Sequence, residues 1–154
     1  MESPYQKIIE LLNGAGVKYE IMEHEPVFTS EQAAKVRNES INSGAKSLLL
    51  RINKKFVLAV LPGGRRLSSK KIKDTFQVKE LRFATPQEVR DIMGCEIGAC
   101  YPFGKIFGVE TIVDESLSKN KIISFNPGVH DKTIKLSPKD YLSIADAKID
   151  DISE

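Results

Sequence analysis

Two apolar, β-rich runs in the middle of the chain constrain its fold more than any other feature. Residues 46–52 and 56–61 are rich in leucine, isoleucine, valine and alanine, and only the polar break Asn53-Lys54-Lys55 separates them. Two such runs joined by a short polar turn are typical of a β-hairpin. Because strands this apolar are buried on both faces, the sequence predicts that the hairpin lies at the centre of a sheet.

Helices are predicted wherever a capping residue is followed by a proline, by a basic run, or by a glutamine or glutamate three residues later whose side chain can bond back to the cap. Such starts occur at Ser3-Pro4, Thr29, Ser68, Thr85-Pro86 and Ser137-Pro138. The corresponding helices are predicted to end near Asn13-Gly14, at residue 37, about two turns after Ser68, at Gly94 and in the acidic tail. Further strands are predicted over residues 17–21, 109–113, 121–125 and 132–136. Residues 98–108, with three glycines and a proline, predict a structured loop.

The order of these elements favours an α+β fold. Strands and helices mix with short connections, and hairpins outnumber crossovers, which argues against a doubly wound parallel sheet. The 154 residues, 41% of them apolar, suffice for one domain with a core and are too few for two ordinary domains. We therefore predict a single compact domain over residues 1–154, in which short helices surround a mixed, mostly antiparallel and barrel-like sheet.

Composition excludes several classes of protein. The 23 basic residues are nearly balanced by 21 acidic ones, so any contact with nucleic acid must be local. Cys95 and Cys100 are too few for a disulfide scaffold and lack the second ligand pair of a zinc site. The sequence has neither an export signal nor a run approaching the roughly 18 to 20 apolar residues of a membrane span. We expect a cytoplasmic protein with reduced thiols and no membrane contact.

The common catalytic signatures are also missing. The serine-hydrolase elbow, the zinc-protease helix, the phosphate loop and the dinucleotide-binding glycine motif do not occur in the sequence. His24 and His130 are the only histidines, which excludes a histidine-rich metal site. No metal or other cofactor is therefore expected.

Five short segments carry a family resemblance. They read His24-Glu25-Pro26-Val27-Phe28-Thr29 with Ala33-Ala34, Gly44-Ala45-Lys46-Ser47-Leu48, Leu58-Ala59-Val60-Leu61-Pro62-Gly63, Gly98-Ala99-Cys100-Tyr101-Pro102-Phe103-Gly104, and Asn126-Pro127-Gly128-Val129-His130. Over roughly residues 5–145, the chain resembles the YbaK and prolyl-tRNA-synthetase editing-domain family of aminoacyl-tRNA deacylases. The resemblance implies a compact α+β domain whose cleft accepts the aminoacylated 3′ end of a tRNA, and it makes prolyl-tRNA synthetase a candidate partner.

The same resemblance implies which residues take part in catalysis. A lysine at the position of Lys46 reaches a phosphate of the terminal nucleotide, a task that suits a flexible ammonium. The segment Gly98-Ala99-Cys100-Tyr101-Pro102 matches the family's Gly-x-x-x-Pro loop, whose backbone N–H groups hold the ester carbonyl. Such donors stabilise an oxyanion by roughly 3 to 4 kcal/mol, about 10² to 10³ in rate. The catalytic candidates are therefore Lys46, Gly98, Ala99, Cys100 and Pro102, with water as the attacking group, assisted by the free hydroxyl of the terminal ribose.

The substrate-binding candidates follow by the same analogy. Gly128-Val129-His130 resembles the Gly-x-His element of the synthetase editing insertions and of alanine-specific stand-alone relatives. A small amino acid such as alanine, attached to tRNA for proline, is therefore favoured over cysteine. The residues expected to shape the pocket are Phe28, Thr29, Ser47, Asn126, Gly128 and His130.

The strongest basic cluster follows the turn at residues 62–64. Its candidate tRNA-binding residues are Arg65, Arg66, Lys70 and Lys71. Cations in this position are suited to the phosphates of the acceptor stem, although a solvated helix face would have the same composition. 

Two alternatives to a trans-editing deacylase stay open. One is a catalytically silent module of the same fold that binds tRNA or a synthetase. The other is a cysteine-dependent hydrolase in which Cys100 is the nucleophile and His130 the base, although a small apolar filler is the commoner role of such a cysteine.

Overall fold

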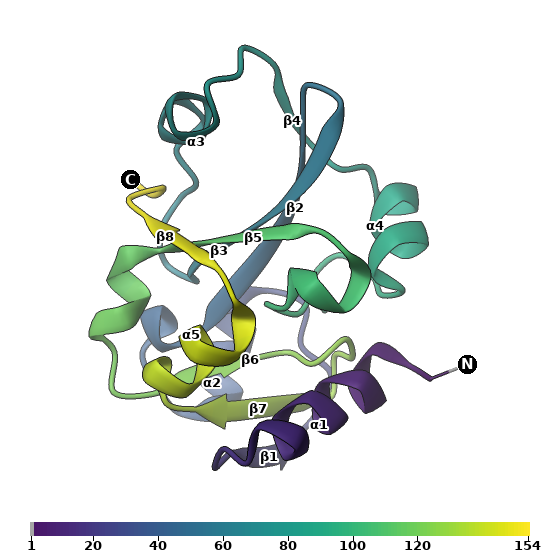
Figure 1. The fold of residues 1–154 in the computed structure, drawn as a ribbon. Helices are drawn as coiled ribbons and strands as arrows, with labels where there is room; N and C mark the ends of the chain where they lie inside the picture. The colour runs from purple at the N-terminus through teal and green to yellow at the C-terminus, as the bar shows by residue number, and fades with distance from the viewer. Residues whose placement is uncertain (1) are drawn as a thin grey trace.

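The predicted hairpin lies at the centre of the larger sheet in the computed structural model, which describes residues 2–154 (Figure 1). Its strands, β2 (Ala45–Ile52) and β3 (Lys55–Pro62), pair antiparallel along their whole length. The turn is Asn53-Lys54, one residue shorter than predicted, because Lys55 belongs to the second strand. Asn53 has a φ of 48°, in the left-handed region that two-residue hairpin turns favour.

Within residues 2–154 the strands form two sheets. The larger has the order β4-β2-β3-β5-β8, in which β4 pairs antiparallel with β2 whereas β5 and β8 extend the sheet in parallel. The smaller is antiparallel, with the order β1-β7-β6, and a bridge between Gly44 and Ser124 links the two. The bounds are β1 (Glu20–Glu23), β4 (Leu81–Phe83), β5 (Glu110–Asp114), β6 (Ile123–Phe125), β7 (Lys132–Leu136) and β8 (Lys148–Asp150). The predicted mixed α+β architecture is confirmed, although the sheets do not close into a barrel.

The predicted helices all form at their predicted caps. They are α1 (Pro4–Ala15), α2 (Ser30–Arg37), α3 (Ser69–Phe76), α4 (Pro86–Met93) and α5 (Pro138–Ala145). In each, the capping serine or threonine accepts a hydrogen bond from the backbone N–H three residues later, which satisfies a donor of the first turn. Short 3-10 turns are η1 (Ile41–Ser43), η2 (Gly104–Phe107) and η3 (Glu115–Lys119). No helix in residues 2–154 has the length and apolarity to cross a membrane.

Several strands depart from the sequence prediction. β1 begins at Glu20 rather than residue 17, and its mostly exposed residues show no apolar alternation. β4 and β8 are absent from the prediction because both are three residues long and largely exposed. They are strands only through their pairing with β2 and β5. The last helix ends where Asp146 takes a φ of 52°, so the acidic tail forms β8 instead of continuing the helix.

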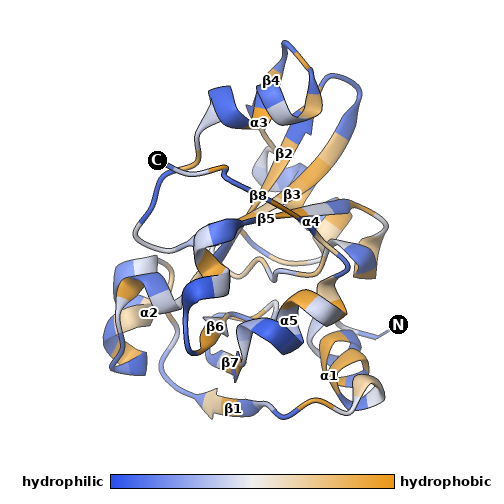
Figure 2. Ribbon diagram, turned by 60° about the vertical axis from the view of Figure 1, so that its left-hand side comes forward, coloured by the Kyte–Doolittle hydropathy of each residue, from blue (hydrophilic) through white to orange (hydrophobic). Residues whose placement is uncertain are grey.

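The larger sheet buries apolar side chains on both faces. One face packs against the smaller sheet, α1 and α5, where Leu49, Phe125 and Tyr141 are buried. The other face packs against α3, where Leu50 and Ile72 are buried. Figure 2 shows the central strands largely in orange and the outer turns of α3 in blue. Consequently β2 is fixed by packing on both sides, and its first residues lie where the two sheets meet.

Glu88 anchors the helix that leads into the glycine-rich loop. Its carboxylate accepts hydrogen bonds from Arg82 at 2.7 and 3.0 Å and from the Thr85 N–H at 2.8 Å. The contact with Arg82, followed by that with Thr85, lowers the pKa of Glu88 to about 2. A carboxyl with a depressed native pKa stabilises the fold above its unfolded pKa of about 4.3, and this contribution is lost as the pH falls toward the native value.

We predict that Glu88→Gln lowers the urea midpoint of unfolding at pH 7, because the amide still accepts the Thr85 N–H but carries no charge opposite Arg82. The difference from the parent should shrink as the pH falls from about 4.5 toward 2. Urea titrations at several pH values measure it. Glu115→Gln is the control, because the carboxylate of Glu115 is exposed and forms no ion pair within residues 2–154. A difference that stays constant with pH would contradict the assignment.

Candidate active site

A cavity of about 260 Å³ opens where α2, the start of β2 and the glycine-rich loop meet. Its walls include the predicted residues Phe28, Thr29, Lys46, Ser47, Gly98, Cys100 and Asn126, together with Arg37. The structure therefore brings together site candidates from four separate parts of the sequence. Among the described residues that line the cavity there is no aspartate or glutamate. Elsewhere in residues 2–154, no group of three or more His, Cys, Asp or Glu side chains is placed to hold a metal ion.

Lys46 is the second residue of β2 and contributes an ammonium to the cavity wall. Its Nζ donates to the carbonyl oxygen of Gly63 at 3.2 Å. Burial lowers the pKa of Lys46, while the charge of Glu31 opposes that shift. An ammonium has three donors, so the contact with Gly63 orients Lys46 and leaves N–H groups for a ligand.

The glycine-rich loop has a backbone shape that requires glycine at position 98. Gly98 has a φ of +95°, and a Cβ there would lie 3.1 Å from the carbonyl oxygen of Phe28. The pKa of the Cys100 thiol is lowered, first by its contact with the Cys95 side chain and also by the N–H groups of Gly98 and Cys100, while burial opposes this shift. Ala99 differs, because it is buried and its N–H donates to the carbonyl oxygen of Glu96 at 3.0 Å.

Two tyrosines hold this loop in place, one within the loop and one in α5. The buried hydroxyl of Tyr101 donates to the carbonyl oxygen of Met93 at 2.7 Å. Tyr141 donates in the same way to the carbonyl oxygen of Pro102, also at 2.7 Å. Pro102 is buried and lies outside the cavity wall. Pro102 can therefore contribute to catalysis, as predicted, only by holding the loop in position.

His130 and Gly128 lie behind the cavity rather than in its wall. Nδ1 of His130 donates to the carbonyl oxygen of Val27 at 3.0 Å, and its ring lies 4.5 Å from that of Phe28, centroid to centroid. Nε2 is buried without a hydrogen-bond partner among residues 2–154. His130 thus supports Phe28 and the Gly98 turn from behind, while Phe28 itself is 58% exposed at the cavity mouth.

The sequence prediction missed Arg37, the last residue of α2. Arg37 is 6% exposed, and its Nε donates to Thr133 Oγ1 at 2.9 Å while an Nη donates to Asn126 Oδ1 at 3.3 Å. Burial lowers its pKa to about 10. The available signal was the four-residue spacing from Ala33, which places both residues on the buried face of α2.

The remaining pocket candidates have partners of their own. The Thr29 hydroxyl accepts the Gln32 N–H at 3.1 Å and so caps α2. The Asn126 amide donates to the carbonyl oxygen of Lys132 at 3.2 Å, which turns Oδ1 toward Arg37. Ser47 is different, because its buried hydroxyl has no hydrogen-bond partner within the described chain.

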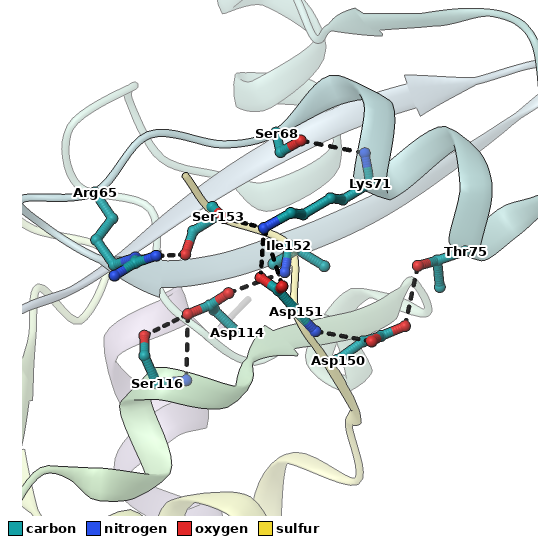
Figure 3. A network of polar contacts seen from close by, with 10 residues as sticks. All are labelled: Arg65, Ser68, Lys71, Thr75, Asp114, Ser116, Asp150, Asp151, Ile152 and Ser153. Atoms are coloured by element: carbon teal, nitrogen blue, oxygen red, sulfur yellow. Dashed lines mark hydrogen bonds and ion pairs between the residues drawn. The ribbon is translucent and has the colours of Figure 1, made fainter.

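Part of the predicted tRNA-binding cluster forms contacts with the C-terminal segment (Figure 3). Arg65 Nε donates to Ser153 Oγ at 2.6 Å, and Lys71 Nζ contacts both carboxylate oxygens of Asp151 at 2.9 Å. The exposed Lys70 pairs with Asp74 at 3.3 Å. None of the candidates Arg65, Arg66, Lys70 and Lys71 lines the cavity. Their role in binding tRNA stays a prediction, and Arg65 and Lys71 already stabilise the fold.

The geometry does not favour Cys100 as a nucleophile activated by His130. The Cys100 Sγ contacts Cys95 Sγ at 4.0 Å and the carbonyl oxygen of Glu96 at 3.9 Å. Within residues 2–154 it forms no hydrogen bond with His130, whose Nε2 has no hydrogen-bond partner and lies 4.0 Å from Glu96 Oε1. A thiol nucleophile needs a base within hydrogen-bonding reach, and the structure does not provide that contact.

The fold and the cavity define an α+β domain with a cationic ligand site bordered by a glycine-rich loop. A model of the aminoacyl-tRNA editing domain matches residues 24–144, which include α2, the central hairpin, the loop and the Asn126–His130 segment. The chain therefore belongs to the aminoacyl-tRNA editing domain family.

Relatives and a solved structure agree with this assignment. The chain is 28% identical over 150 residues to the Multifunctional Ser/Thr-tRNA deacylase ProXp-y of Escherichia coli (strain K12), with 94% of this chain and 90% of that protein covered. It is 27% identical over 148 residues to the Prolyl-tRNA editing protein ProX of Acetoanaerobium sticklandii, with 92% and 90% covered. A crystal structure assigned as a candidate trans-editing enzyme for prolyl tRNA synthetase shares the fold, with a TM-score of 0.88, 24% identity, and 100% and 99% covered.

These findings confirm the predicted family and enzyme class. The chain is an aminoacyl-tRNA deacylase, a hydrolase of the ester bond that joins an amino acid to tRNA. Its substrate partner is accordingly tRNA. The roles of the individual site residues stay predictions.

We predict that Gly98→Ala lowers the rate of ester hydrolysis by about 10²-fold, because displacing the N–H groups of the loop has the effect of losing an oxyanion donor. A side chain at a φ of +95° strains the turn and crowds Phe28. Single-turnover deacylation of mischarged tRNA measures the effect.

Gly108→Ala is the matched control, because Gly108 has a φ of +76° with nothing within 4 Å of an added Cβ. It introduces similar backbone strain without touching the cavity. Equal hydrolysis rates in the two folded variants would show that the loop takes no part in hydrolysis.

Proposed function

We propose that this chain acts in trans on mischarged tRNA and hydrolyses the ester of a small amino acid, with alanine on tRNA for proline as the first candidate. The observation that carries the proposal is that Lys46 and the Gly98 turn, 52 positions apart in the sequence, line the same cavity. The name of the ProX relative, a prolyl-tRNA editing protein, supports the choice of tRNA. The protein then works in the cytoplasm, alone or docked on prolyl-tRNA synthetase.

In the proposed mechanism, the protein positions the ester and stabilises the developing charge. Lys46 holds a phosphate of the terminal nucleotide, and backbone N–H groups of the Gly98 to Pro102 loop stabilise the oxyanion. Water, assisted by the free hydroxyl of the terminal ribose, adds to the ester carbonyl. The tetrahedral intermediate then expels the ribose oxygen, which takes up a proton, so that free amino acid and intact tRNA leave.

The energetic demand of this reaction is modest. An aminoacyl ester is already activated, and a thousandfold acceleration requires only about 4 kcal/mol of barrier lowering. Positioning and a pair of aimed N–H groups can supply that amount. The mechanism therefore needs no nucleophilic side chain, in agreement with the missing contact between Cys100 and His130.

Serine is a second candidate substrate, because the E. coli relative is named a Ser/Thr-tRNA deacylase. Both small amino acids fit a site that rejects bulkier ones by sterics.

A panel of alanyl, seryl, threonyl and cysteinyl esters on several tRNAs tests activity and specificity together. We predict that Lys46→Ala lowers kcat/KM by about 10- to 100-fold on every ester, because a hydrogen bond to a charged group contributes about 1.5 to 3 kcal/mol. Lys54→Ala, in the exposed hairpin turn, is the matched control and should behave like the parent. A fully active Lys46→Ala protein would refute this assignment, whereas tRNA binding without turnover of any ester would support the silent module.

The ratio of kcat/KM on the seryl and alanyl esters decides between the two candidate substrates. Cys100→Ser should remain active on either substrate, and its inactivity together with inactivation by thiol alkylation would restore the cysteine mechanism.

A further inference from the structure

Arg37 is a buried cation without a carboxylate partner. Only 6% of the residue is exposed, yet within residues 2–154 no carboxylate oxygen lies within 4.0 Å of its guanidinium. Glu39 acts on its charge from a distance but is itself paired with Lys135 at 3.5 Å. Buried charges are normally paired, because removing a charge from water is costly. The position of Arg37 at the end of α2 favours a cation, but that interaction is much smaller than the cost of burial.

Neutral groups hold the guanidinium of Arg37 in a fixed orientation. Thr133 Oγ1 accepts from Nε at 2.9 Å and lies 2.8 Å from Nε2 of His24. Nδ1 of His24 lies 2.7 Å from the carbonyl oxygen of Glu25 and donates to it, so the Thr133 hydroxyl donates to Nε2. Asn126 Oδ1 accepts from one Nη at 3.3 Å. These bonds use two of the five donors of a guanidinium, which is therefore oriented but not saturated.

The second Nη of Arg37 faces Gly44 in the cavity wall. A Cβ at position 44 would lie 3.0 Å from Nη1. Gly44 has a φ of −76°, which any residue adopts, so the backbone itself does not require glycine there. The missing side chain leaves space beside the guanidinium instead. Arg37 and Lys46 both line this acid-free cavity, which therefore favours an anion.

We propose that Arg37 is a second phosphate-binding residue, which joins Lys46 at the phosphodiester that precedes the aminoacylated terminal nucleoside of the tRNA. This inference rests on the proposed function, because it takes the 3′ end of a tRNA as the ligand. In that ligand the carboxyl group of the amino acid is esterified, so the phosphodiester is the anion. Arg37 supplies fixed donors and Lys46 a mobile point charge. A protonated α-amino group is repelled by both cations, which places the amino acid toward Gly98 and Cys100.

The test compares two forms of the trinucleotide cytidylyl-cytidylyl-adenosine, neither of which carries an amino acid. One is natural, and the other carries a neutral methylphosphonate at the linkage before the adenosine. We expect the parent protein to bind the natural form about tenfold or more tightly, the usual effect of hydrogen bonds to a charged group. Moving the methylphosphonate to the other linkage should change the affinity much less.

Arg37→Gln should reduce this preference several-fold, and Arg37→Lys should retain part of it. Gly44→Ala is a second variant that keeps the charge but displaces the guanidinium, so it should also reduce the preference. Arg51→Gln, at the opposite end of β2, is the matched control. A purely structural role of Arg37 would weaken both trinucleotides equally and leave their ratio unchanged.

An unchanged ratio in folded Arg37→Gln and Gly44→Ala proteins would overturn the inference. A parent protein that hydrolyses mischarged tRNA but shows no preference for the phosphodiester would overturn it while leaving the proposed function intact. A parent that neither binds the trinucleotide nor hydrolyses any ester would overturn both.

Discussion

The register of β2 in the larger sheet is the constraint on which the site depends. β2 is buried on both faces, so a slip by one residue would move its apolar side chains from one core to the other. The same register places Lys46 and Ser47 on opposite faces at the start of the strand, beside the bridge that joins the two sheets. The core therefore determines where the cation of the cavity lies.

The loop on the other side of the cavity is rigid for a different reason. Tyr101 ties the loop to Met93 at the end of α4, and Tyr141 of α5 ties Pro102 of the loop to the core, each through a hydroxyl that donates to a backbone carbonyl. His130 and Phe28 pack behind the turn at Gly98. Backbone donors fixed in this way need little reorganisation when charge develops in the transition state. In the proposed mechanism, such donors allow the deacylase to work without a catalytic triad.

Two pairs of cations in the chain have different surroundings. Arg65 contacts Ser153 and Lys71 contacts Asp151, both in the C-terminal segment, so these two cations stabilise the fold. Arg37 and Lys46 face a cavity without acidic side chains. A basic run in the sequence is thus a weaker indicator of a ligand than cations without acidic partners, because the nearest carboxylate decides whether a charge is still available.

The sequence by itself determined the elements that depend on neighbouring residues. Helix caps are bonds over three positions, and the hairpin needs only two apolar runs and a polar turn, so both could be predicted, as could the family. The tertiary structure decided the rest. β4 and β8 are polar and become strands only through distant partners. Arg37 meets Thr133 and Asn126, which lie 96 and 89 positions away, and no local pattern encodes such contacts. They exist only because α2 packs against the smaller sheet, and the cavity forms where these segments meet the start of β2.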